Sequence, residues 1–325
     1  MGKFLPFSAH PEATVSNRWA FSKSPKGRGT NASTLPKVIR CMIEAPPGRV
    51  FVSPDLPQAE ARIVAWDAQC LSMIKALSDP TRHIHIENCN RLFNHNLVPG
   101  TAETKEYQKG DEYRQGKAML HAANYRMSAK RLAVELGMEL GPAKRLLERY
   151  FHLYPEIPLW HETIKNRIRE KGFLETPSPF KRKRLFYTAM AELLNTGSIS
   201  TEVWNSACSW IPQSAVADII NWGLRRLKDE FGDTVWVHKH DHDSYLVSVR
   251  EEDQHQIIPR ALDILQITLS LHDRSLRMVP EMSVGCNYGL MVDWIGEPLS
   301  RDQWWEQVKC RMDEEKLRKD LYGYI

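Results

Sequence analysis

The chain has 325 residues, of which 42% are hydrophobic and 26% charged, as in ordinary globular proteins. This length allows one large domain or two smaller ones, and a net charge of +4 does not by itself indicate a nucleic-acid binder. The six cysteines include no CxxC pair, which argues against a zinc ribbon or a disulfide framework and favours a reducing compartment. No apolar run approaches the ~20 residues that span a bilayer, so we expect a soluble protein.

The first half of the chain predicts one short strand followed by helices. The first fifty residues are rich in turn formers and predict irregular or extended structure. A proline–glycine turn in APPGRVFVSPD precedes a predicted strand over about 49–53. From about residue 58 apolar residues recur at spacings of three and four, which predicts helix. Helical periodicity continues over about 80–172, interrupted by the loop NHNLVPGTAE, and ends at Gly172, a typical helix C-cap.

The second half predicts one long helix and a few strands. The helix lies over about 200–230, and TVWVHKH, SYLVSV and EMSVGCN are typical of strands. The last twenty-five residues predict a charged helix. Helices outnumber strands, and the strands lie beside the candidate carboxylates. The pattern therefore indicates an α+β chain in which a small antiparallel sheet carries the functional site.

The stretch VHKHDHDSYLV, residues 237–247, contains three histidines and two aspartates in six consecutive positions. On a strand, His238, His240 and His242 would share one face, spread over ~13 Å at about 3.3 Å per residue. A zinc ion needs its ligands within ~2.1 Å of one point, which only a sharply turned loop could supply. A zinc loop, a metal-dependent hydrolase site and a solvated hairpin are therefore alternative interpretations.

Another interpretation pairs Asp243 with Asp55, which ends the strand RVFVSPD. Carboxylates at neighbouring strand ends can hold two divalent cations ~3.5–4 Å apart, an arrangement that transfers phosphoryl groups. Each aspartate taken alone is more typical of a helix cap or a turn.

Three separated stretches resemble the motifs of one family in the correct order. VSPDLPQAEARIVAW is similar to motif A (DYSQxELRxLA) of the family A DNA polymerases, the bacterial DNA polymerase I type. YRQGKAMLHAANYRMS resembles motif B, and HDSYLVSV resembles motif C (HDExxxxV). HIHIENCNRLF, LYPEIPLW, ETPSPFKRKRLF and IPQSAVADII resemble the connecting segments, so the resemblance covers roughly residues 15–295.

The resemblance implies a DNA-directed DNA polymerase that transfers nucleotides from dNTPs to a primer 3′-hydroxyl. Asp55 and Asp243 would be catalytic and would hold two Mg²⁺ or Mn²⁺ ions with the backbone carbonyl of Leu56. In the family, the acidic position matched by Glu60 narrows the sugar pocket and excludes a 2′-hydroxyl. The implied nucleotide-binding residues are Gln58, Glu60, Arg114, Lys117, His121 and Tyr125.

The candidate nucleotide residues of motif B also form a pattern of their own. Tyr113, Lys117, His121 and Tyr125 recur every four residues and so share one face of a helix. A lysine there can bind a triphosphate, and a ring one turn further on can stack on a base or sugar. The same pattern also fits an amphipathic helix with a solvated basic edge.

Basic clusters in KNRIREKG and KRKR can neutralise phosphates, although charge runs are commonly solvated faces. The family register makes primer or template contact the favoured interpretation. The implied DNA-binding residues are Arg18, Asn31, Arg62, Arg182, Arg184, Gln213 and His242.

Several positions depart from the family pattern. His121 stands where the family has Phe or Tyr, and Arg126 replaces the glycine that follows the motif B tyrosine. Asn205 and Ser209 replace an arginine and an asparagine of the late helix. We therefore expect fewer contacts with primer and template than in the familiar enzymes.

The resemblance also predicts the domain organisation of a right-hand polymerase. A palm would comprise residues 1–80 with motif A and 173–298 with motif C, separated by helical fingers over 81–172, with a C-terminal helix over 299–325. We expect no full thumb and no exonuclease domain.

The expected partners are primer–template DNA, dNTPs and a separate subunit that supplies thumb, exonuclease or processivity function, in the cytoplasm of a bacterial or phage-infected cell. Two alternatives stay open at this point. One is a polymerase-derived DNA-binding or assembly subunit of a replication complex with weakened activity. The other is the hydrolase that uses the histidine cluster.

Overall fold

A computed structural model describes residues 7–10, 14–16, 18–23 and 31–311. The chain divides into two compact units. The sheet unit comprises Met1–Pro57, Val216–Thr268 and Arg277–Ile325, and the helical unit comprises Gln58–Ala215 and Leu269–Leu276. Within the described ranges, no helix has both the length and the apolarity that crossing a membrane requires. The mixed helical and antiparallel architecture confirms the predicted α+β class.

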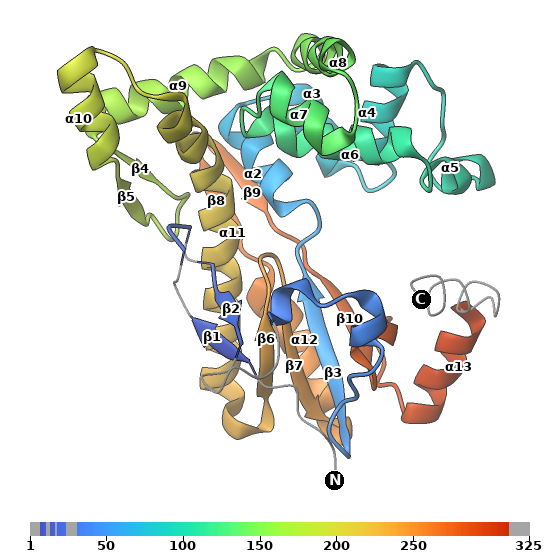
Figure 1. Cartoon of the computed structure of the whole chain (residues 1–325). Helices are drawn as coiled ribbons and strands as arrows, with labels where there is room; N and C mark the ends of the chain where they lie inside the picture. Colours follow the sequence, from blue (N-terminus) through green and yellow to red (C-terminus); the bar gives the residue numbers. More distant parts are fainter. Residues whose placement is uncertain (1–6, 11–13, 17, 24–30, 312–325) are drawn as a thin grey trace. The chain divides into compact units, whose positions relative to one another are not determined.

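A five-stranded antiparallel sheet is the centre of the sheet unit (Figure 1). Its strand order is β11-β10-β3-β7-β6. The strands are β3 (Arg49–Asp55), β6 (Trp236–His240), β7 (Tyr245–Arg250), β10 (Glu281–Gly285) and β11 (Val292–Asp293). The four predicted strands near the carboxylates are confirmed as β3, β6, β7 and β10, and the first one, predicted over about 49–53, extends to Asp55.

The two faces of this sheet differ because residues alternate in direction along each strand. Val50, Val52, Val247, Val249 and Val284 on one face are all at most 1% exposed. Helix α12 (Gln254–Leu265) packs against β3, β7 and β10, as Figure 1 shows. This coverage leaves the opposite face as the place for polar residues.

The opposite face is apolar only at one end of the sheet. There Phe51 and Leu246 pack with Ala45 and with the partly buried Tyr288 and Met291. Toward the other end the same face carries the partly exposed Ser53 and Ser283 and the exposed Asp55 and Glu281. The sheet therefore presents its polar side chains where β3 ends.

Helix α11 (Thr201–Phe231) begins in the helical unit and ends in the sheet unit. It confirms the long helix predicted over about 200–230. The smaller elements of the sheet unit are β1 (Ser8–His10), β2 (Ala20–Ser22), η1 (Ala32–Thr34), α1 (Lys37–Arg40), η2 (Gly232–Thr234), η3 (Glu251–Asp253), η4 (Tyr288–Leu290) and α13 (Arg301–Arg311). The predicted C-terminal helix is confirmed over α13, and residues 312–325 lie outside the described part of the chain.

Helices dominate the helical unit, as the periodicity predicts. They are α2 (Ala59–Asp67), α3 (Leu71–Ser78), α4 (Ile84–Phe93), α5 (Ala102–Tyr107), α6 (Asp111–Asn124), α7 (Ala129–Leu136), α8 (Leu140–Leu153), α9 (Glu156–Lys171) and α10 (Tyr187–Thr196). Helix α9 ends at Gly172, whose φ of 73° confirms the predicted C-cap.

Two hairpins were not predicted, one within the helical unit and one whose end residues, Thr268 and Arg277, belong to the sheet unit. They are formed by β4 (Phe173–Glu175) with β5 (Lys183–Leu185) and by β8 (Thr268–Leu271) with β9 (Arg274–Arg277). Strands of three or four residues are too short for an alternating pattern to stand out. The boundary between the compact units falls between Pro57 and Gln58, because α2 packs against α6 and α3 against α4. The functional division into palm and fingers stays a prediction.

Close packing of α4 on α6 requires the glycine at position 116. A Cβ added there would lie 2.5 Å from the sulfur of Cys89, which is fully buried. We expect Gly116→Ala to destabilise the helical unit by about 1–3 kcal/mol because the two helices would have to separate. Urea unfolding measures the change. Adding Cys89→Ala should recover most of the loss, and a double variant as unstable as Gly116→Ala would contradict this account.

Candidate metal and nucleotide site

The structure brings Asp55 and Asp243 together at one end of the sheet. Asp55 ends β3, and Asp243 lies in the turn between β6 and β7. The backbone N–H of Leu56 donates a hydrogen bond to the carbonyl oxygen of Asp243 at 3.1 Å, and Asp55 forms an isolated β-bridge with Ser244. Two turns that are almost two hundred residues apart in the sequence are therefore joined by their backbones.

Pro54 helps to shape this end of β3. It has no N–H, so it cannot donate to a neighbouring strand. The ladder between β3 and β7 runs from Arg49 to Val52, and pairing resumes only at the Asp55 bridge. The interruption lies directly before the candidate carboxylate, where the strand leaves the sheet.

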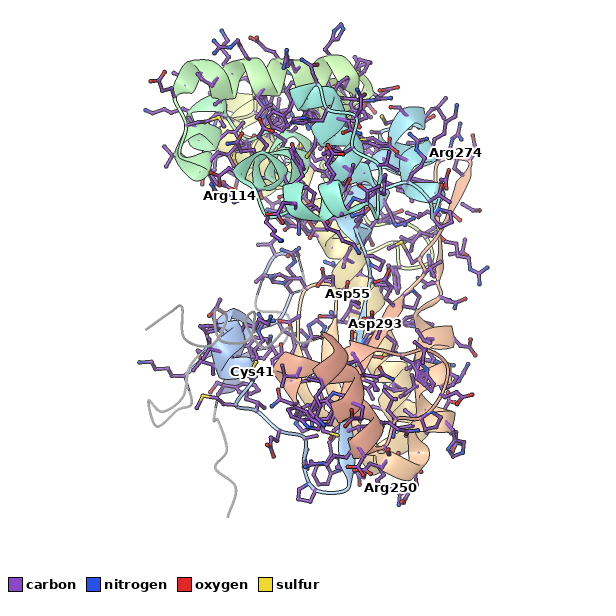
Figure 2. All side chains as sticks on the ribbon, turned by 90° about the vertical axis from the view of Figure 1, so that its right-hand side faces the viewer. Cys41, Asp55, Arg114, Arg250, Arg274 and Asp293 are labelled. Carbon is purple, nitrogen blue, oxygen red and sulfur yellow. The ribbon has the colours of Figure 1, made fainter. Side chains whose placement is uncertain are left out.

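A third carboxylate, Glu281, lies beside this pair and was not predicted. In the register between β3 and β10, Glu281 is the residue directly opposite Asp55. Figure 2 shows Asp55 and Asp293 toward one end of the sheet and Arg250 at the other. Only the pairing of strands more than two hundred residues apart identifies Glu281, so no local signal in the sequence could have found it.

The environment of Asp55 favours its neutral form. Partial burial of the carboxyl group, the negative charge of Asp243 and that of Glu281, in this order, raise the pKa of Asp55 to about 6, although a hydrogen bond from the backbone of Leu56 opposes them. A divalent cation would favour the carboxylate and so displace the proton. The raised pKa of Asp55 therefore reflects its partial burial and the repulsion among the three carboxylates at this end of the sheet.

This pKa predicts how pH acts on cation binding. The folded chain retains the Asp55 proton to higher pH than the unfolded chain. The stability that this protonated carboxyl group contributes is therefore present below pH 3.8 and lost as the pH rises through about 6. Mn²⁺ binding should weaken as pH falls below about 6, since the ion competes with the proton. Glu281→Gln removes one repelling charge and should move this midpoint to lower pH.

Electron paramagnetic resonance of free Mn²⁺ measures the effect between about pH 5 and 8. Glu297→Gln is the matched control, because this exposed glutamate of the same unit lies outside the sheet. An unchanged midpoint in Glu281→Gln, or an equal shift in the control, would contradict the assigned electrostatics.

The predicted common face of the three histidines is wrong. A β-bulge between Val237 and Lys239 interrupts the alternation of β6. His238 hydrogen-bonds the Ser248 hydroxyl at 2.8 Å and contacts the ring of Phe51, on the face of the sheet opposite α12. His240 instead stacks on Trp19 with ring centroids 4.9 Å apart. His242 is exposed in the following turn.

The bulge also places Lys239 inside the protein. Its ammonium forms an ion pair with Asp241 at 2.7 Å and donates to the Tyr288 hydroxyl at 2.9 Å. The side chain is only 4% exposed. Among the residues the structure describes, no three His, Cys, Asp or Glu side chains are grouped so as to hold a metal by themselves. This holds for the histidine cluster and equally for the group of Asp55, Asp243 and Glu281.

In the helical unit, the predicted face of motif B lies on α6. Lys117 and His121 are exposed there. The pKa of His85 is lowered to about 3, mainly by burial and then by the charges of His83, Lys117 and His121, in this order. Tyr113 packs edge-on against His85 with centroids 6.4 Å apart. The repeat of four residues thus produces one continuous face of the helix.

Glu60 of α2 joins this face of α6. The Tyr125 hydroxyl donates a hydrogen bond to the Glu60 carboxylate, and His121 Nδ1 lies 4.0 Å from the same Oε2 atom. The rings of His121 and Tyr125 have centroids 6.3 Å apart. The carboxylate and the two rings form a polar group that could contact a sugar. Arg114 is exposed and pairs with Asp111 at 2.9 Å, and Gln58 is partly buried just before α2.

Arg182 and Arg184 extend from the β4–β5 hairpin to one side of α11. Arg182 Nη2 donates to the Ser214 carbonyl at 3.3 Å, and Arg184 Nη1 donates to the Ser206 hydroxyl at 3.2 Å. Gln213 is partly buried on α11 beside Ser214. Arg182 and Arg184 are therefore each held by a hydrogen bond to α11.

The other predicted DNA-binding residues lie on separate elements. Arg18 precedes β2, Asn31 precedes η1, and both are partly buried in the sheet unit. Arg62 is partly buried on α2 of the helical unit. Arg18 and Asn31 thus belong to the sheet unit and Arg62 to the helical unit.

Comparison with known proteins identifies DNA polymerases among the relatives of this chain. The model of "DNA polymerase family A" matches residues 30–289. DNA polymerase I of Rhizobium leguminosarum is 25% identical over 280 residues, which cover 81% of this chain and 26% of that protein. The thermostable DNA polymerase I of Thermus aquaticus is 27% identical over 252 residues, covering 73% and 28% respectively. This chain spans about a quarter of the length of the curated relatives it matches.

A solved structure shares the fold. It is described as the POL domain of Pol1 from M. smegmatis in complex with DNA primer-template and dNTP. The TM-score is 0.68 at 19% sequence identity, and the match covers 87% of this chain and 48% of the other. The likeness extends over both compact units.

Proposed function

This chain belongs to DNA polymerase family A, and we propose that it is a DNA-directed DNA polymerase that adds deoxynucleotides to a primer 3′-hydroxyl. The observation that carries the proposal is the meeting of Asp55 and Asp243 through the Leu56–Asp243 backbone hydrogen bond. Both residues fall on the aspartate positions of the family motifs A and C.

The residues at this end of the sheet fit divalent cations. Mg²⁺ in phosphoryl-transfer sites takes oxygen ligands from one or two carboxylates and completes its shell with substrate phosphates and water. Asp55 and Asp243 would supply the carboxylates, and Leu56 its backbone carbonyl. When bound, two such ions activate the primer hydroxyl and stabilise charge on the transferring phosphoryl group and the leaving pyrophosphate.

The helical unit would supply the nucleotide contacts. The exposed ammonium of Lys117, assisted by Arg114, would bind the triphosphate, since a cation on an exposed helix face can reach phosphate oxygens without burying its charge. Gln58, His121 and Tyr125 would line the base and sugar. Glu60, oriented by the Tyr125 hydroxyl, would oppose a ribose 2′-hydroxyl and so select dNTPs.

Basic and polar side chains of both units would bind the primer and template. Arg182 and Arg184 would contact phosphates, whose neutralisation makes DNA affinity fall with salt. Gln213 would contact the base pair through the minor groove, and His242 would contact the primer end. Arg18, Asn31 and Arg62 would make the remaining contacts.

Primer extension by the purified chain tests the proposal. A primed DNA template is incubated with dNTPs or with rNTPs in Mg²⁺, and product length is measured. We expect extension with dNTPs and at least tenfold less with rNTPs, a ratio that requires about 1.4 kcal/mol of discrimination. Salt-sensitive DNA binding without any extension in Mg²⁺ or Mn²⁺ would instead support the DNA-binding or assembly subunit.

A further inference from the structure

Arg126 has a backbone conformation that ordinarily belongs to glycine. Helix α6 ends at Asn124, and Tyr125 is its C-cap. The N–H of Arg126 donates to the Ala123 carbonyl at 3.2 Å, and the N–H of Met127 donates to the Ala122 carbonyl at 2.8 Å. This pair of bonds defines a Schellman motif, in which the residue after the cap is left-handed. Arg126 accordingly has a φ of 55°, a conformation that strains any side chain with a Cβ.

The side chain of Arg126 is held from the first turns of α11. Its guanidinium lies over the ring of Trp204, 3.3 Å from the centroid. Its Nη1 donates to Asn205 Oδ1 at 2.7 Å. Such stacking and hydrogen bonding suit the planar guanidinium better than any other cation. These contacts are able to offset the strain of the backbone.

Trp204 is in turn held in place by α9. Its Nε1 donates to the His161 carbonyl at 2.9 Å, and the ammonium of Lys165 lies 4.2 Å from the ring centroid. The ring therefore contacts cations of two different segments. The end of α6, the middle of α9 and the start of α11 are joined through this one indole.

Arg126 directly follows Tyr125, the residue whose hydroxyl orients Glu60. Holding the Arg126 side chain limits rotation of the backbone that carries the Tyr125 ring. We propose that Arg126 is a positioning residue that sets sugar selectivity by fixing Tyr125 against Glu60, with Trp204 and Asn205 as its anchor. The inference rests on the proposed function and assigns a purpose to an arginine where the family has glycine.

Arg126→Gly separates strain from positioning. Glycine adopts the left-handed conformation without a Cβ penalty, so the urea midpoint of the helical unit should change little despite the lost contacts. Selectivity should nevertheless fall: the ratio of kcat/KM for dNTP to that for rNTP should decrease about tenfold, with a higher KM for dNTP. Trp204→Leu removes the anchor from the other side and should lower the same ratio.

Gln69→Gly is the matched control. Gln69 is an exposed non-glycine residue with a φ of 54° in the helical unit, in a turn outside the candidate nucleotide face. The Gln69→Gly substitution should stabilise the protein slightly and leave the ratio of kcat/KM for dNTP to that for rNTP unchanged. A wild-type ratio in Arg126→Gly would overturn the inference, as would a lower urea midpoint and lower kcat without any change in the ratio. Wild-type extension is measured in the same series, so failure of the proposed function appears separately, as absence of wild-type product.

Discussion

Replacing Asp55 or Asp243 by asparagine is expected to lower the rate of primer extension by roughly 10³-fold. An amide has nearly the shape of a carboxylate but lacks the negative charge that retains a divalent cation. The loss therefore falls on metal-dependent chemistry rather than on packing. Single-nucleotide extension in Mg²⁺ under single-turnover conditions measures it, since this format excludes product release from the observed rate.

The folded state should tolerate these substitutions. Asp55→Asn removes a carboxylate whose charged form is disfavoured by burial and by Asp243 and Glu281, so the metal-free protein should become slightly more stable at neutral pH. Asp233→Asn, at a fully exposed side chain of the same unit, should leave both extension and stability unchanged. Extension within tenfold of wild type in either Asp55→Asn or Asp243→Asn would eliminate the two-metal assignment.

Asp67→Asn is expected to destabilise the helical unit by about 3 kcal/mol. The carboxylate is almost fully buried and accepts hydrogen bonds from Trp160 Nε1 at 2.6 Å, Arg167 Nη2 at 3.1 Å and His272 Nε2 at 3.2 Å. Its removal leaves the cationic partners without a counter-charge in a partly buried environment. We place the loss at the low end of the usual range because Arg167 and His272 retain some exposure.

The pH dependence of stability provides a second signature of this cluster. Burial alone would raise the pKa of Asp67, but the hydrogen bonds and charges of His272, Arg167 and Trp160 outweigh burial and hold it below its usual value. The hydrogen bond to Asp67 raises the pKa of His272. The stability that the Asp67 carboxylate contributes is thus present above pH 3.8 and lost as the pH falls through its lowered pKa.

Stability from His272 has the opposite sign. It is present below 6.5 and lost as pH rises through the raised pKa of the imidazole. The difference between wild type and Asp67→Asn in urea unfolding should therefore be largest between about pH 4 and 6.5. Glu106→Gln, which breaks an exposed pair with Lys109 in the same unit, should cost less than about 1 kcal/mol. Equal losses of unfolding free energy in Asp67→Asn and Glu106→Gln would show that the buried cluster stabilises the protein no more than an exposed ion pair does.

Local rules of sequence were sufficient for most elements and for the motif residues. Apolar spacing predicted α2, the helices of residues 80–172 and α11, and glycine at position 172 predicted the end of α9, because each signal lies within one helix. The same rules placed Asp55 at a strand end and arranged Lys117, His121 and Tyr125 on one helix face. Each of these inferences needs only residues within about two turns or one strand.

Long-range pairing decided what the sequence left open. Glu281 faces Asp55 only because β10 pairs with β3 in one register, and the histidines lie on different sides only because β6 has a bulge opposite β7. No residue near position 126 indicates Trp204 as its anchor, and nothing near Asp67 indicates His272. Such contacts join segments that are tens to hundreds of residues apart. By itself, therefore, the sequence determined the order of the elements and the chemical groups along them. The tertiary structure decided which of these groups meet, because register and packing depend on partners that local periodicity does not encode.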